Sequence, residues 1–135
     1  MEILDKPDPM NVWIGSSHNP VHERSETDWW CTPVAAAAGD LILMYEKGAG
    51  IKRVERIKSV RSTLRGVEKA CEVRGMKTVD TLLVLNLRTA ISYHEFLRHP
   101  FLRNLPSVKR KFQGTCLRVP PAMWPELKVL VEEHT

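Results

Sequence analysis

The sequence has no long hydrophobic run. Apolar stretches such as Ile42–Tyr45 and Leu82–Leu85 fall far short of the roughly 20 residues that a membrane helix needs. The first residues, Met1–Pro7, also lack the basic and then apolar pattern of a secretion signal. We therefore expect a cytoplasmic protein that has no membrane partner.

Cysteine is scarce in this chain. Cys31, Cys71 and Cys116 form an odd and widely spaced set with no CxxC pair. Such a set predicts neither a disulfide framework nor a zinc knuckle. We expect three buried free thiols, as is usual in a reducing cytosol.

Familiar catalytic and cofactor motifs are also missing. The chain contains no P-loop, GxGxxG, GxSxG or HExxH sequence. His18 and His22 have the spacing of a helical metal pair, but Pro20 lies between them and argues against a helix. Cys31 could act as a nucleophile with one of these histidines as its base, yet no third group orients such a pair. We predict a non-catalytic protein without a metal or a cofactor.

Length and charge set the broad class. With 135 residues, 43% of them hydrophobic, the chain fits a single domain over residues 1–135 with its core at about 10–133. The formal net charge of +4 and a sequence pI of about 9.1 would attract a polyanion. This charge permits a nucleic-acid partner without identifying one.

Several apolar segments predict strands. In 51–60 the apolar positions recur at spacing three, which would also suit a helix, but the Lys47–Gly50 turn before them favours a hairpin. Residues 17–28 are polar and predict a surface excursion. The predicted strands cover 10–15, 40–45, 51–60, 79–87 and 114–119.

Helices are expected at three places. Pro33 and Gly39 bracket a short alanine-rich helix, and Ser92 begins a capping box whose helix ends at His99. Pro120 opens an amphipathic C-terminal helix. Residues 63–75 permit a helix or a strand, and 101–111 a turn or a single helical turn. These elements together predict an α+β domain with a mixed or barrel-like sheet.

The pair Trp29-Trp30 is the most informative local feature. Two indoles in a polar loop, shortly before the strand that follows Gly39-Asp40, are either a structural plug or a wall of a stacking pocket. If this segment were extended, its side chains would alternate, so we expect only one of the two rings to line a pocket.

Several short segments follow one another in an informative order: Val12–Ser17, Trp29-Trp30, Gly39-Asp40, Gly50-Ile51, Phe101-Leu102, Lys111–Thr115 and Trp124–Leu127. In the order and spacing of these segments the chain resembles an EVE domain, a member of the PUA-like superfamily that also includes the YTH and ASCH domains.

The resemblance implies a PUA-like small mixed β-barrel of about five to six strands with short flanking helices. It also implies a pocket, between the first strand, the loop after it and the neighbouring helix, that receives a modified cytosine or adenine flipped out of nucleic acid. We expect DNA rather than RNA as the partner, and a nuclease effector would be a separate protein.

The residue types present suit this role. A flipped base needs aromatic rings to stack on and a few hydrogen-bonding groups at its edge. Basic side chains around the pocket, the basic rim, would bind the phosphates. Trp13 and Tyr45 lie in apolar strands, so core packing is the alternative interpretation of both. The predicted base-binding residues are Trp13, Ser16, Ser17, Trp29, Trp30 and Tyr45. The predicted phosphate-binding residues are Lys47, Lys52, Arg53, Lys109, Arg110 and Lys111.

Two other functions stay open at this point. An ASCH-like RNA-binding or small amidohydrolase domain would place a lysine beside an acidic residue in the cleft, and Lys47 with Glu46 or Lys58 with Glu55 are the candidates. A protein-interaction domain would instead present the aromatic residues as a flat exposed patch.

Overall fold

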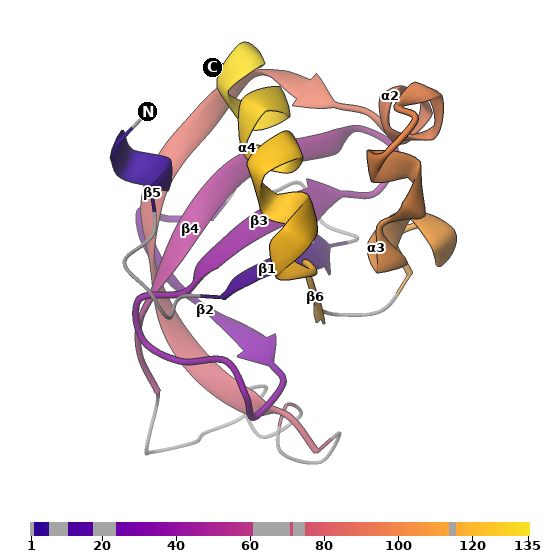
Figure 1. Ribbon diagram of the computed structural model, residues 1–135. Coiled ribbons are helices and arrows are strands. Elements are labelled where there is room, and N and C mark those ends of the chain that lie inside the picture. Colours follow the sequence, from indigo (N-terminus) through magenta and orange to yellow (C-terminus); the bar gives the residue numbers. More distant parts are fainter. Residues whose placement is uncertain (1, 6–10, 18–23, 61–70, 72–74, 114–115) are drawn as a thin grey trace.

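The computed structural model describes residues 2–5, 11–17, 24–60, 71, 75–113 and 116–135 (Figure 1). His18 and His22, and most of the segment 63–75, therefore lie outside the described residues. Within the described part, no helix is long and apolar enough to cross a membrane.

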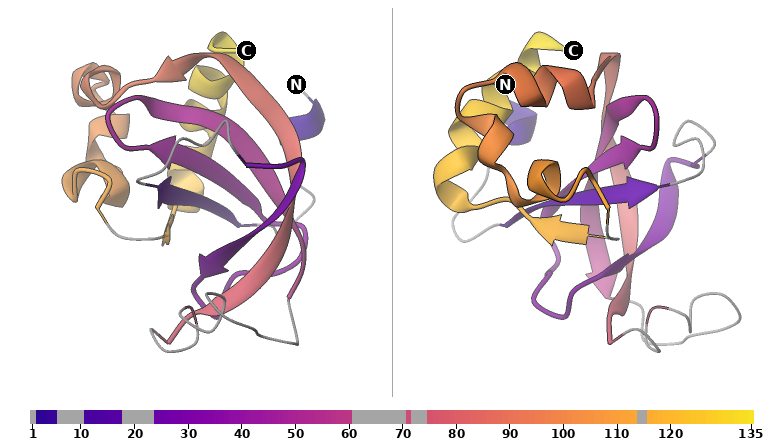
Figure 2. Two further views of the ribbon diagram at one scale, coloured as in Figure 1. Left: turned by 180° about the vertical axis from the view of Figure 1, so that it is seen from behind. Right: turned by 90° about the vertical axis from the view of Figure 1, so that its right-hand side faces the viewer.

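In the described residues, six strands form one strongly curled mixed sheet, which makes a half-barrel (Figures 1 and 2). The order is β2-β5-β4-β3-β1-β6; β1 runs parallel to β3, and the other neighbours are antiparallel. This confirms the expected α+β class with a mixed sheet. The strands are β1 (Val12–Ser17), β2 (Thr27–Thr32), β3 (Leu41–Glu46), β4 (Gly50–Val60), β5 (Lys77–Ile91) and β6 (Cys116–Arg118).

Short helices cover one face and one end of the sheet (Figure 1). Helix α2 begins where predicted, because the Ser92 hydroxyl accepts a hydrogen bond from the Glu95 amide at 3.2 Å. The Glu95 carboxylate contacts His134 instead of closing the capping box. The helices are α2 (Tyr93–Arg98), α3 (Pro106–Lys109) and α4 (Trp124–Glu133), with 3-10 turns η1 (Glu2–Leu4), η4 (Leu102–Asn104) and η5 (Pro121–Met123).

The main hydrophobic core lies between these helices and the sheet. Side chains alternate across a strand, so every second residue of β1 and β3 points toward the helices. Leu41 and Leu43 of β3, Phe96 of α2 and Leu127 of α4 are fully buried there. Burial of this apolar surface fixes which face of the sheet the helices cover.

A second, smaller core lies on the opposite face, which we call the inner face. Its buried members include Trp13, Ile42, Met44, Ile57 and Val79. The long β5 pairs with β4 along most of its length and with β2 near its start, so β2 is carried over this face (Figure 2). The half-barrel therefore encloses apolar side chains of its own.

Two predictions of secondary structure are wrong. Residues 33–38 form turns rather than a helix, because the Asp40 carboxylate accepts from the Ala37 amide at 3.0 Å and holds the chain in a turn. Trp29 and Trp30 lie in β2, not in a loop. This segment became a strand because β5, which is distant in sequence, supplies its hydrogen bonds.

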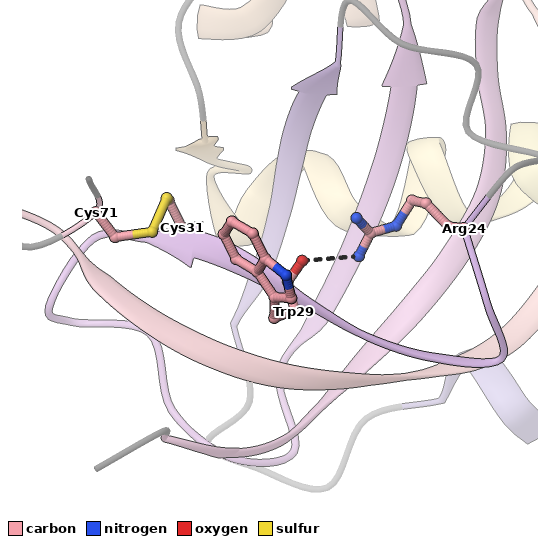
Figure 3. Close-up of a disulfide and its surroundings, with 4 residues drawn as sticks. All are labelled: Arg24, Trp29, Cys31 and Cys71. Carbon is pink, nitrogen blue, oxygen red and sulfur yellow. Dashed lines mark hydrogen bonds between the residues drawn. A yellow bond between two sulfur atoms is a disulfide. The ribbon is translucent and has the colours of Figure 1, made fainter. Parts of the chain in front are cut away.

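The prediction of three free thiols is wrong for two of them. Cys31 and Cys71 form a disulfide with a Cα–Cα distance of 5.2 Å, across a sequence separation of 40 residues (Figure 3). The fold places the end of β2 against residue 71, which spacing along the chain does not reveal. Cys116 is a buried free thiol as expected, and burial raises its pKa to about 12.

Candidate functional site

The carboxyl ends of the parallel strands β1 and β3 bring several predicted residues together. Ser16 is opposite Tyr45 in the register and Ser17 is opposite Glu46. The Lys47 amide then donates to the Ser17 carbonyl at 2.9 Å. Both serines are half-buried, and Lys47 is exposed in the turn that follows β3.

Trp30 lies beside this edge, on the inner face. It is opposite Val79 in the β2–β5 pairing and packs against the inner-face core. A Cβ atom on Gly15 would lie only 2.8 Å from the Trp30 Nε1. The indole therefore rests directly on the β1 backbone, one residue before Ser16, in space that a side chain at position 15 would fill.

The two neighbouring tryptophans diverge as strand geometry requires. Trp29 is opposite Asp80 in the register, so alternation directs it to the other face of the sheet from Trp30. Both indoles are half-buried. Trp30 is therefore the ring of this pair that faces the inside of the half-barrel.

An ionic network adjoins Trp30 on the inner face. Arg24 donates from Nε to Glu55 Oε2 at 2.7 Å and from Nη2 to Glu55 Oε1 at 2.8 Å. Thr81 donates its hydroxyl to the same carboxylate at 2.6 Å, and Arg53 Nε lies 2.9 Å from Glu55 Oε2. Arg24 also donates to the Trp29 carbonyl (Figure 3).

The pKa of Glu55 reflects this network. Burial alone would raise the pKa of its carboxyl, but the hydrogen bonds and charge of Arg24, the Thr81 hydroxyl and the Arg53 charge together hold the pKa below its ordinary value. Glu55 is therefore ionised inside the half-barrel, and it anchors both arginines.

Two of the predicted aromatic residues belong to the interior. Trp13 is 3% exposed, and its Nε1 donates to Asp40 Oδ2 at 2.9 Å. Tyr45 is 8% exposed and stacks on Phe112 with ring centroids 3.9 Å apart. Burial raises the pKa of the Tyr45 hydroxyl. The structure supports core packing, the alternative considered for both residues.

Most of the predicted basic rim is at the surface. Lys109, Arg110 and Lys111 are exposed at the end of α3, and the Tyr45–Phe112 stack brings this run to the end of the sheet that carries Lys47. Lys52 lies 3.8 Å from Glu46 in a surface ion pair.

Arg53 is not part of this rim. It is 4% exposed and donates to the carbonyls of Arg24 and Ser25 at 3.1 and 3.0 Å. Its guanidinium is used inside the fold, so its prediction as a phosphate-binding residue needs correction.

Other kinds of site find little support among the described residues. They contain no group of three His, Cys, Asp or Glu side chains that could hold a metal ion.

Lys58 is exposed while Glu55 is buried against two arginines, and Glu46 lies against Lys52. In both lysine–acid pairs considered for an amidohydrolase, the acidic member thus contacts other cations. A shallow groove of about 550 Å³ lies elsewhere, between Glu26 and Thr27 and the Leu82–Asn86 part of β5.

Comparisons with known proteins bear on the fold. No protein family model matches the chain. No curated protein matches it either. Solved structures do match: a hypothetical protein from Leishmania major superposes with a TM-score of 0.70 at 14% identity, covering 93% of this chain and 97% of that one.

Two further matches are complexes with modified nucleic acid. Human THYN1, in complex with DNA containing 5-methylcytosine, has a TM-score of 0.65 at 12% identity, covering 90% of this chain and 98% of that one. The YTH domain of Zygosaccharomyces rouxii MRB1, in complex with N6-methyladenosine RNA, has a TM-score of 0.64 at 10% identity, covering 97% of this chain and 92% of that one. At such identities the similarity concerns the fold. The chain therefore shares the α+β fold of these structures, a YTH domain among them, as the resemblance in its sequence led us to expect.

Proposed function

We propose that this chain is a non-catalytic nucleic-acid-binding domain that recognises a modified base, flipped out of its strand and held against Trp30. Modified cytosine or adenine in DNA is the proposed ligand, with RNA as the comparison to be tested. Any nuclease that acts on the bound nucleic acid would be a separate protein. The similar folds of the THYN1 and YTH complexes support a ligand of this class.

The position of Trp30 is the observation that carries the proposal. Its ring is half-buried on the inner face and lies on the backbone of Gly15, next to Ser16 and Ser17. A flipped base needs a planar apolar surface with hydrogen-bonding groups at its edge. An indole supplies the surface, and stacking on it contributes about 1–3 kcal/mol of binding free energy per base. Serine hydroxyls and the strand backbone supply donors and acceptors.

Basic side chains exposed at the same end of the sheet as Ser16 and Ser17 are proposed to bind the phosphates. Lys47, Lys109, Arg110 and Lys111 are exposed at the same end of the sheet and can contact phosphates on either side of the flipped nucleotide. Lys52 is a weaker contributor because Glu46 already offsets its charge.

A binding titration tests the proposal. Labelled oligonucleotides that differ only in one 5-methylcytosine or N6-methyladenine, as DNA and as RNA, are titrated with the wild type and with Trp30→Ala and Trp29→Ala. Trp30→Ala should weaken binding of the preferred modified strand by about tenfold or more. Trp29→Ala is the matched control and should have a smaller effect, since its ring faces the other side of the sheet. Equal affinity for every strand, unaltered by either substitution, would rule out the proposal.

A further inference from the structure

Arg24 is an additional residue of the proposed site that no sequence motif marks. It lies just before β2, and its side chain is 12% exposed. Its guanidinium carbon is 5.0 Å from the centroid of the Trp30 ring. This distance is that of a cation–π contact, so Arg24 adjoins the ring against which the base is proposed to lie.

The guanidinium is rigidly held. Its Nε and Nη2 atoms bind both oxygens of Glu55, a carboxylate that is 1% exposed, and Nη2 also reaches the Trp29 carbonyl at 3.2 Å. Breaking a buried, hydrogen-bonded ion pair costs more than stacking one base returns. A base that enters beside Trp30 therefore leaves Arg24 where it is, and the guanidinium forms part of the wall.

The Nη1 atom is the part of Arg24 that this anchoring does not use. Among the residues that the structure describes, Nη1 has no hydrogen-bond partner, and its ion-pair contact is with Asp28 Oδ2 at 3.7 Å. That separation is too long for a hydrogen bond. The planar guanidinium thus directs two N–H groups away from Glu55 beside an aromatic ring, where they can meet an acceptor.

We infer that Arg24 is a base-reading residue, which donates from Nη1 to an acceptor on the edge of the base held against Trp30. Glu55 is a positioning residue that holds the guanidinium in place. This inference rests on the proposed function. It differs from a phosphate contact because Arg24 is anchored on the inner face rather than on the exposed rim.

A salt series separates a base contact from a phosphate contact. Affinities for DNA with and without 5-methylcytosine, and for RNA with and without N6-methyladenosine, are measured at several salt concentrations for the wild type and Arg24→Gln. If Arg24 contacts the base, the preference of Arg24→Gln for the modified strand should be at least tenfold lower than that of the wild type. The slope of log K against log salt should be the same for both proteins. A phosphate contact predicts that the slope falls by about 0.9 on DNA and that the preference persists, which would overturn the inference.

Further variants guard against a purely structural effect. Arg24→Lys keeps the charge but lacks the planar guanidinium with its several N–H donors. It should therefore lose the preference for the modified strand as well. Arg103→Gln and Arg103→Lys, at an exposed position on η4, are matched controls that should retain it. Thermal unfolding confirms that each variant is folded at the assay temperature. If the wild type prefers a modified strand and Arg24→Lys retains that preference in full, Arg24 does not read the base, although the proposed function stands. If the wild type has no preference, both proposals fail together.

Discussion

At the scale of single residues, Gly15 decides whether Trp30 can rest on β1. A methyl group at this position would meet Trp30 Nε1 at 2.8 Å and Ile42 Cγ2 at 3.3 Å. Gly15→Ala should therefore displace the indole, destabilise the protein by about 1–3 kcal/mol and weaken binding of the modified strand. Tryptophan fluorescence measures the displacement of the indole, denaturant unfolding measures the loss of stability, and an oligonucleotide titration measures the loss of binding. Unchanged fluorescence with wild-type affinity would show that the indole does not depend on this contact.

Glu55 gives the half-barrel a dependence on acid pH. Its pKa is lowered in the folded protein, so its stabilising contribution is complete above the ordinary glutamate pKa of about 4.3 and is lost as the pH falls through the lower folded value. Glu55→Gln should cost about 3 kcal/mol or more at neutral pH, because two arginines lose their carboxylate. The free energy of unfolding of this variant should also fall less steeply than that of the wild type as the pH is lowered. Unfolding free energies measured from neutral to acid pH test this, and parallel curves for the two proteins would contradict it.

At the scale of elements, the disulfide ties β2 to residue 71. Loop closure over a separation of 40 residues corresponds to about 4 kcal/mol in the chain-entropy description. The double variant Cys31→Ser, Cys71→Ser should lose up to this amount and should weaken binding, because β2 carries Trp30. Cys116→Ser is the control, and it should leave β2 anchored. A double variant as stable as the wild type would show that the bond contributes nothing to folding.

A thiol titration checks the same bond directly. The unreduced, unfolded chain should show the single thiol of Cys116, and the reduced chain should show all three cysteines. In the folded protein Cys116 should not react at mildly alkaline pH, because burial raises its pKa to about 12. Three reactive thiols without reduction would mean that Cys31 and Cys71 are not joined.

At the scale of the whole molecule, the exposed cations at one end of the sheet predict a strong effect of salt on binding. Changing Lys109, Arg110 and Lys111 together to alanine should weaken modified and unmodified strands about equally. It should also reduce the slope of log K against log salt by roughly 0.9 for each DNA phosphate that the variant no longer neutralises. Lys58→Ala, on the exposed part of β4, is the control for a general reduction of positive charge. A weakening confined to the modified strand would mean that this run contacts the base.

Much of the architecture was predictable because its signals are local. Apolar strand segments, the Ser92 cap and the Pro120 helix start depend on neighbours within a few residues, and each appears close to the predicted place. The segment Thr27–Thr32 gave no such signal. It becomes a strand because β5, which is distant in sequence, lies beside it.

Local patterns in the amino-acid chain were enough to predict an α+β domain with a mixed sheet, an aromatic pair before a buried strand and a surplus of positive charge. Long-range packing settled which side chains share a face: it buried Trp13 and Arg53, joined Cys31 to Cys71 and set Arg24 beside Trp30. The two kinds of information differ in range. Helix caps and strand periodicity are properties of adjacent residues, whereas Arg24 meets Glu55 across 31 positions, through a curl of the sheet that no short segment encodes.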